Sequence, residues 1–158
     1  MPCIHIPDLP WEEQHSPARK FHSFCRNISV ALGGVRNGGP WCGGHPFDVQ
    51  LRRIPAGAAV CPFHSHLAQW ELFVVQLGRG CVRVGAETQE VGADDVFFHP
   101  PGEPHQIRAA AESELVFLLI ADNPPVDYWH HPDSQKWGLR APRKFFRPVE
   151  VDYWDGEE

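Results

Sequence analysis

Two histidines and a glutamate lie close together in the segment CPFHSHLAQWELFVVQLG, residues 61–78. His64 and His66 alternate in an extended chain and therefore point to the same side, and Glu71 follows at the start of an apolar run. A titratable side chain that is buried without a partner costs roughly several kcal/mol, so three of them at the mouth of an apolar strand need a common partner. A bound metal ion is the partner that this chemistry predicts.

A fourth ligand is expected from the segment FFHPPGEPHQI, where His105 follows a Pro-Gly turn at the start of another apolar strand. Three neutral imidazoles and one carboxylate suit one divalent transition metal ion: Fe, Mn, Ni, Zn or Cu. The ligand types do not choose among these metals. The predicted metal ligands are therefore His64, His66, Glu71 and His105. As catalytic residues we expect Glu71, which also accepts a proton, and Gln69, which donates an orienting hydrogen bond.

Short apolar segments must position these ligands. From Phe47 onward, stretches of about four to eight residues rich in Val, Phe, Ile and Leu are separated by Gly, Pro or Asp, a spacing typical of an all-β sandwich or barrel. The expected strands lie in FDVQLRRIP, WELFVVQL, CVRVG, TQEVG, DVFFHP, HQIRA and ELVFLLIA.

The chain length of 158 residues indicates a single domain, 1–158. Residues 1–45 are interpreted as an irregular N-terminal arm and residues 46–122 as the barrel core. Residues 123–158 combine many prolines with aromatic side chains that are unusual in disordered segments. We expect them to form an ordered C-terminal tail packed on the barrel.

Composition and charge narrow the class of partner. The formal net charge of -6 argues against a general nucleic-acid binder and against a polybasic membrane ligand, so we expect a small-molecule ligand or substrate. The first residues lack a secretion signal, and the apolar run LVFLLIA is too short to span a bilayer, which predicts a cytoplasmic protein without a membrane partner. Five scattered cysteines without a CxxC pair predict reduced thiols.

Two spaced motifs in this chain resemble those of the cupin superfamily. The first motif is His-x-His followed by Glu and Gly, and the second is Gly, then Pro-x-Gly, then His. The matching positions are His64, His66, Glu71, Gly78, Gly92, Pro100, Gly102 and His105. The chain departs from the pattern at Gly57, which lies one residue further from the first histidine, and at Ala109, where an Asn is common. The resemblance covers residues 46–122 and implies a double-stranded β-helix (jelly-roll) barrel, similar to that of small single-domain bacterial cupins.

The resemblance implies several functions, because cupins include oxygenases, isomerases, decarboxylases, epimerases and binding modules. We favour a metal-dependent, dioxygenase-like enzyme, since four side-chain ligands leave two positions of a six-coordinate ion for a substrate oxygen and O2. An apolar wall of Phe73, Val75 and Leu77 would suit a planar or weakly polar small organic molecule. The alternatives are a metal-dependent sugar-type isomerase or lyase and a non-catalytic small-molecule-binding cupin. Exposed barrel edges further predict a homodimer.

Several neighbouring residues have simpler interpretations than metal binding or catalysis. Trp70 is expected in the core, and His99 is expected to be a turn histidine rather than a fifth ligand. His130 and His131 are adjacent and would point to opposite sides of an extended chain, which favours a surface loop over a second metal site.

Overall fold

The computed structural model describes residues 2–140 and 143–158. Within these residues the fold is all-β, as predicted. The strands are β1 (Glu12–His15), β2 (His22–Asn27), β3 (Phe47–Ile54), β4 (Ser65–His66), β5 (Glu71–Val84), β6 (Glu87–Gly92), β7 (Val96–His99), β8 (His105–Ala109), β9 (Leu115–Asp122), β10 (Tyr128–His131), β11 (Lys136–Leu139) and β12 (Lys144–Phe146). The helical segments are η1 (Ile6–Asp8), α1 (Ile28–Ala31) and η2 (Pro40–Cys42). No helix in the described part of the chain is long and apolar enough to cross a membrane.

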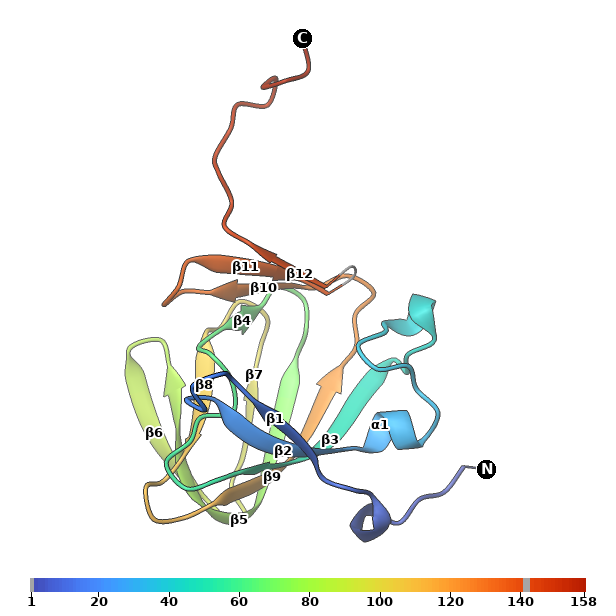
Figure 1. Ribbon diagram of the computed structural model, residues 1–158, viewed down its shortest axis with the longest axis vertical. Helices are drawn as coiled ribbons and strands as arrows, with labels where there is room; N and C mark the ends of the chain where they lie inside the picture. The colour runs from blue at the N-terminus through green and yellow to red at the C-terminus, as the bar shows by residue number, and fades with distance from the viewer. Residues whose placement is uncertain (1, 141–142) are drawn as a thin grey trace.

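The long strand β5 belongs to both walls of the barrel. Its first half pairs with β7 and β9, and its second half pairs with β6 and β8. From β9 the larger wall continues through β3 and β2 to β1, with every neighbouring pair antiparallel. The two walls face each other across the core (Figure 1), which is the jelly-roll architecture that the cupin resemblance implies.

A bulge divides β5 where it passes from one wall to the other. The register shifts between Val75 and Leu77, and Gly78 follows with a φ of 83°. A Cβ atom at Gly78 would lie only 1.8 Å from the Glu114 backbone oxygen, so this turn requires glycine. Because the bulge changes the side to which the chain points, Leu77 is 55% exposed, and the prediction that it joins the apolar wall is wrong.

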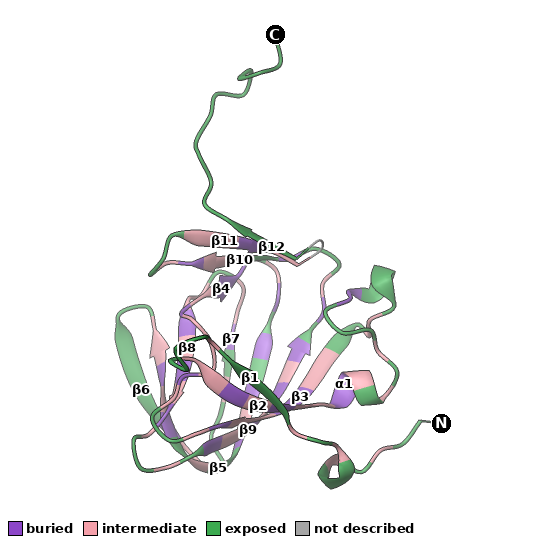
Figure 2. Ribbon diagram, in the orientation of Figure 1, coloured by how far each residue is buried: buried purple, intermediate pink, exposed green. Residues whose placement is uncertain are grey.

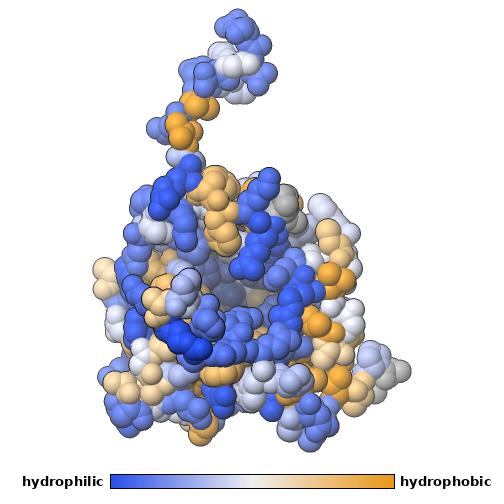
Figure 3. Space-filling model, in the orientation of Figure 1, coloured by the Kyte–Doolittle hydropathy of each residue, from blue (hydrophilic) through white to orange (hydrophobic). Residues whose placement is uncertain are grey.

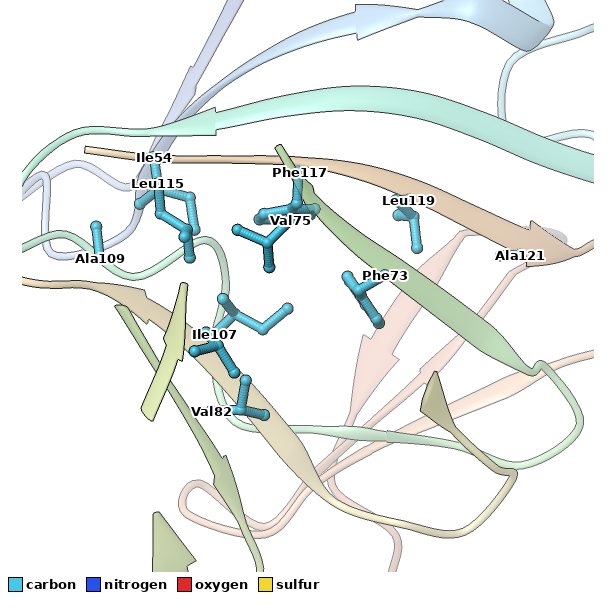
Figure 4. Close-up of a cluster of buried hydrophobic side chains, with 11 residues drawn as sticks. Ile54, Phe73, Val75, Val82, Ile107, Ala109, Leu115, Phe117, Leu119 and Ala121 are labelled. Atoms are coloured by element: carbon cyan, nitrogen blue, oxygen red, sulfur yellow. The ribbon is translucent and has the colours of Figure 1, made fainter. Parts of the chain in front are cut away.

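Alternate residues of the facing strands form one apolar core (Figure 4). Strand β9 shows the pattern most clearly, since Leu115, Phe117, Leu119 and Ala121 are buried and the residues between them are not. The core consists of Ile54, Phe73, Val75, Val82, Val91, Ile107, Ala109, Leu115, Phe117, Leu119 and Ala121. Each fully buried Val, Leu, Ile or Phe contributes roughly 1.5–3 kcal/mol of transfer free energy, so this core holds the barrel together without a metal ion.

The N-terminal arm contributes two strands to the larger wall. β2 pairs with β3, and β1 pairs with β2. Their register places Gln14 of β1 opposite Ser23 of β2. The arm therefore supplies side chains close to the predicted ligands.

The segment after the barrel folds into a small sheet that lies across one end of the barrel (Figure 1). Its strand order is β12-β11-β10-β4, and β10 pairs with β4 through Trp129 and His66. The tail thus meets the barrel at a predicted metal ligand. Residues 147–158 are all exposed and extend away from the rest of the molecule (Figure 2).

Candidate metal centre

The four predicted metal ligands come together at the end of the barrel beneath the small sheet. His64 and His105 exchange two backbone hydrogen bonds, of 3.1 and 2.8 Å, which hold the first motif against the second. His66 lies in β4, and Glu71 is the first residue of β5. The chain pairing therefore places side chains from both motifs around one point.

The ligand atoms of these residues face one another. The Nε2 atoms of His64 and His66 are 3.3 Å apart, and Glu71 Oε2 lies 3.6 Å from His66 Nε2. Glu71 Oε2 is also 3.0 Å from His105 Nε2. His66, Glu71 and His105 are buried, and His64 is partly buried. The ligand atoms of His64, His66 and Glu71 all lie within 4.8 Å of one another, close enough to bind one ion, and His105 approaches this group through Glu71.

Hydrogen bonds on the far side of each ring fix which nitrogen faces the centre. In all three rings Nδ1 contacts an oxygen atom that can only accept, so Nδ1 carries the hydrogen and Nε2 keeps its lone pair. The acceptors are Asp127 Oδ2 for His66 at 2.6 Å, Pro62 O for His64 at 2.9 Å and Glu103 O for His105 at 3.1 Å. With neutral rings of this tautomer, the Nε2 lone pairs of His64, His66 and His105 are free to bind a metal ion.

The carboxylate of Glu71 also fits a site for a divalent metal ion. Burial alone would raise the pKa of Glu71, but without a metal ion the close contact with His105 Nε2 and the positive charges of protonated His66, His105 and His64 outweigh burial and hold this pKa well below its usual range. Its Oε2 atom is buried and forms no hydrogen bond of acceptable geometry among the described residues. The ionised carboxylate therefore needs a positive charge beside it, and when the three rings are neutral a metal ion supplies that charge.

Asp127 is a functional residue that sequence reasoning missed. It lies just before β10 and is 2% exposed. Besides the bond to His66, its Oδ1 accepts a hydrogen bond of 2.9 Å from the Ala68 backbone nitrogen. Burial opposes ionisation of Asp127, but the hydrogen bond and charge of His66 lower its pKa below the ordinary value. The tail therefore orients a metal ligand through a buried carboxylate.

Three of the four candidate ligands, His64, Glu71 and His105, line a cavity of about 270 Å³ inside the barrel. Its floor is apolar and includes Phe73, Ile107, Phe117 and Leu119. Its polar residues other than the ligands are Gln14, Arg52 and Arg143. The same three residues also line a neighbouring polar cavity between the arm and the barrel. Figure 3 shows a hollow in this face of the molecule, with mostly hydrophilic residues around it.

Arg52 presents an uncompensated positive charge to this cavity. Its guanidinium donates to Gln14 Oε1 at 2.8 Å, Gln50 Oε1 at 2.9 Å and Ser23 Oγ at 3.3 Å, all of them neutral oxygens. Within the described part of the chain, no carboxylate forms a salt bridge with Arg52. The guanidinium is thus held in place while its charge stays available to an anion.

Cys61 also lines the cavity but is a poor nucleophile. Burial raises the pKa of its thiol to about 11, so the thiolate is scarce at neutral pH. Its Sγ lies 3.7 Å from His64 Nδ1, which is already bonded to a carbonyl oxygen. Nucleophilic catalysis by Cys61 is therefore not expected in this cavity.

Comparison with known proteins identifies the domain that carries these residues. Residues 50–121 match the family model of the cupin domain, and this range contains both motifs. The protein has a cupin domain. The motif residues of the chain thus lie in the matched region, as the resemblance implied.

Known proteins are similar to this cupin domain in sequence and fold. An oxalate-binding protein from Thermotoga maritima is 29% identical over 68 residues, which are 43% of this chain and 55% of that protein. A proposed sugar phosphate isomerase from Acidithiobacillus ferrooxidans has a TM-score of 0.78 at 16% identity, covering 93% of this chain and 92% of its own. A sugar phosphate isomerase from Silicibacter pomeroyi has a TM-score of 0.77 at 18% identity, covering 96% and 98%. At these identities the two structures establish the fold.

The other residues singled out in the sequence lie around the cupin site rather than in it. Gln69 is buried and donates a hydrogen bond of 2.5 Å to the Asp122 backbone oxygen; it does not line the described cavity. Trp70 is 50% exposed and stacks on Phe98, so the prediction that it belongs to the core is wrong. The Trp70 ring is therefore part of the outer surface.

His99 and His131 pack against ligand rings of the cupin site. His99 is the last residue of β7; its ring is parallel to that of His105 at 3.9 Å, and its Nδ1 bonds to Glu103 at 2.7 Å. His131 is buried in β10, 5.9 Å from the His64 ring, so its prediction as part of a surface loop is wrong. Burial, with the nearby charges of His64 and Lys136, lowers the pKa of His131 to about 4.

Proposed function

We propose that this cupin is a metal-dependent enzyme that acts on a small organic anion. One divalent transition metal ion would be held by His64, His66, Glu71 and His105. The observation that carries the substrate class is Arg52, whose guanidinium lines the same cavity and is bonded to neutral oxygens. A carboxylate or phosphate group is the natural partner of such a guanidinium.

A second cation strengthens the preference for an anion. Arg143 lines the cavity together with Arg52 and forms no salt bridge among the described residues. Among the described residues that line the cavity, Glu71 is the one with a carboxylate, and its Oε2 atom faces the imidazoles of His66 and His105. The oxalate-binding relative, which takes a small dicarboxylate by its name, supports the same class of ligand.

The residues of this site have different roles in the proposed reaction. Arg52 and Gln14 bind and orient the anionic end of the substrate, and the apolar floor keeps bulk water away from the other end. A bound divalent ion supplies Lewis-acid polarisation of a substrate oxygen. Glu71 would hold the ion, and its strongly lowered pKa makes it a weaker base than an ordinary carboxylate, which argues against the proton-accepting role expected from the sequence. Asp127 keeps His66 in the tautomer that binds metal.

Gln69 acts from outside the cavity as a positioning residue. Its hydrogen bond to the Asp122 backbone oxygen joins the end of β9 to the start of β5. Asp122 Oδ1 in turn accepts a hydrogen bond of 2.8 Å from the Trp70 backbone nitrogen. Both bonds come from the residues just before Glu71 and hold the start of β5 against the end of β9.

The polar mouth of the cavity favours an isomerase or lyase reaction that needs no oxygen. Sequence reasoning expected a mainly apolar inner face, but Gln14, Arg52 and Arg143 give it donors for carboxylate, phosphate or hydroxyl groups. The second candidate is a dioxygenase-like reaction, which the apolar floor of Phe73 and Phe117 favours. Turnover of metal-loaded protein with hydroxy acids, keto acids and sugar phosphates, measured under argon and under air, separates the two reactions.

Binding of oxalate to metal-loaded protein tests the anion site itself. Arg52→Gln removes one charged donor, and the loss of a hydrogen bond to a charged group weakens binding by about 10- to 100-fold. Arg53→Gln is the matched control, because Arg53 is the next residue of β3 and stacks on Phe24 and Trp11 at 4.5 and 5.0 Å. Equal oxalate affinity of the two variants in calorimetry would contradict the proposed substrate class.

A further inference from the structure

A second cavity lies between the small sheet and the loop that leads into β4. Its volume is about 330 Å³, and it is lined on the sheet side by Trp129, His131, Lys136 and Phe145. Trp129 and His131 alternate along β10 and therefore share one face, and Lys136 stands opposite His131 in the register with β11. One face of the small sheet thus brings a histidine, a lysine and two aromatic rings into the same space.

Gly138 allows the two aromatic rings to form a wall of this cavity. It lies in β11 opposite Phe145, and a Cβ atom there would come within 2.7 Å of both the Phe145 and the Trp129 ring. Without a side chain at Gly138, the two rings stack with centroids 5.8 Å apart. Lys136 Nζ then lies 5.6 Å from the centre of the Phe145 ring, and the Arg143 guanidinium lies 5.7 Å from it. The aromatic wall holds two cations at the cavity.

Neither cation is neutralised by an acid in the described part of the chain. Lys136 and Arg143 form no salt bridge there. The acid of the turn between β10 and β11, Asp133, is bound instead by Arg83 through contacts of 2.9 and 3.1 Å. Two positive charges therefore face the cavity without a counter-charge, in a chain whose net charge is -6.

His131 adds a buried imidazole whose contact with the Phe63 backbone is too poor in geometry to form a good hydrogen bond. His131 is only 8% exposed, yet neither of its ring nitrogens forms a hydrogen bond of acceptable geometry among the described residues. A buried polar group without a partner carries a free-energy cost, so such a group lining a cavity indicates a ligand that supplies the partner.

We propose that this cavity is a second anion site, one that binds a phosphate group. Lys136, Arg143 and His131 offer donors from three side chains, and a tetrahedral phosphate has enough terminal oxygens to accept from all of them. A carboxylate has two oxygens in one plane and satisfies fewer of these donors. This cavity adjoins that of the candidate metal centre, because Cys61, His64, Trp129 and Arg143 line both. His131 and Lys136 line this cavity alone, and their donors do not require a bound metal ion.

Calorimetry of metal-free protein with inorganic phosphate tests this site apart from any metal-bound anion. We expect one phosphate per chain, with binding weakened about tenfold or more in Lys136→Gln through the loss of a charged donor. Lys144→Gln is the matched control, because Lys144 is exposed in β12 and precedes Phe145, so it points to the other face. His131→Gln should also weaken binding, while its far-UV circular dichroism reports whether it folds.

Each outcome of this experiment decides for or against the site. Weaker phosphate binding in Lys136→Gln than in Lys144→Gln, with acetate binding more weakly than phosphate, supports it. Absence of phosphate binding by the wild type, equal effects of the two lysine variants, or acetate binding as tightly as phosphate overturns it. A folded His131→Gln variant that binds phosphate like the wild type removes His131 from the site and overturns the three-donor arrangement.

Discussion

Replacing Asp127 by Asn should loosen the metal site without touching any ligand. The wild-type carboxylate accepts two hydrogen bonds, from His66 Nδ1 at 2.6 Å and from the Ala68 backbone nitrogen at 2.9 Å. An asparagine of the same size offers only one oxygen, so one of the two donors meets an NH2 group instead. If His66 loses its acceptor, its ring turns or moves its hydrogen to Nε2, and the lone pair aimed at the metal is lost.

The expected effect of Asp127→Asn follows from this geometry. Loss of the partner of a metal-binding histidine lowers metal affinity by about 10- to 100-fold, which equals about 1.4–2.8 kcal/mol. The core of the barrel does not include Asp127, so the variant should still fold. Competition for Zn(II) with a chromophoric chelator measures the affinity, and zinc avoids redox chemistry during the assay.

Asp133→Asn is the matched control for this experiment. Asp133 belongs to the same small sheet but binds Arg83 at the surface, away from the ligands. Its loss should leave zinc affinity unchanged, because an exposed ion pair contributes little. If folded Asp127→Asn binds zinc as tightly as Asp133→Asn does, the role given to Asp127 is refuted.

Three further predictions concern the fold, the assembly and the thiols. Gly78→Ala should destabilise the barrel by more than the roughly 1–2 kcal/mol that a left-handed backbone costs a residue with a side chain, because the new Cβ would also clash with the Glu114 backbone. Gly85→Ala is the control, because Gly85 has a φ of 57° but open space around it; equal thermal midpoints of the two variants would contradict the prediction. Light scattering of the wild type should give about twice 17.8 kDa, because the apolar side chains of Trp70, Leu72, Val96 and Phe98 are exposed on or next to the paired strands β5 and β7. The Phe98→Glu variant should be a monomer, whereas a monomeric wild type would count against a homodimer. Native protein should react with thiol reagents at the exposed Cys3 and Cys42 and not at Cys25, which is buried and whose pKa is raised by that burial; rapid labelling of Cys25 would show that β2 opens.

The barrel could be predicted, and the candidate ligands could be recognised, because their signals are local. Each strand of the core alternates buried and exposed residues or forms a short apolar run, and the two motifs carry His64, His66, Glu71 and His105 at recognisable spacing. The structure brings these four side chains together because His64 and His105 pair through their backbones.

The residues that we propose to bind an anion could not be predicted, because strands distant in sequence bring them together. Gln14 reaches the cavity only because β1 pairs with β2 and β2 with β3. Arg52 looks like a solvated strand residue until its acceptors Gln14, Gln50 and Ser23 are placed around it. The one local hint was the polar pair Gln50 and Arg52, two residues apart in a predicted strand.

The role of the tail and the exposed position of Leu77 could not be predicted, for related reasons. Asp127 lies 61 residues after His66 in the sequence, in a segment whose prolines and aromatic rings indicate order but give no pairing partner. Leu77 keeps the alternation of Phe73 and Val75 in the sequence, but the bulge before Gly78 reverses its direction. Alternation predicts a face only as long as the register holds.

Metal analysis of protein purified without chelators tests the central claim most directly. The account predicts about one divalent transition metal ion per chain in the wild type and a sharp loss in His66→Ala and His105→Ala, with unchanged far-UV circular dichroism because the apolar core forms without the ion. A wild type that takes up no such ion when it is offered, or variants that keep the wild-type stoichiometry, would contradict it.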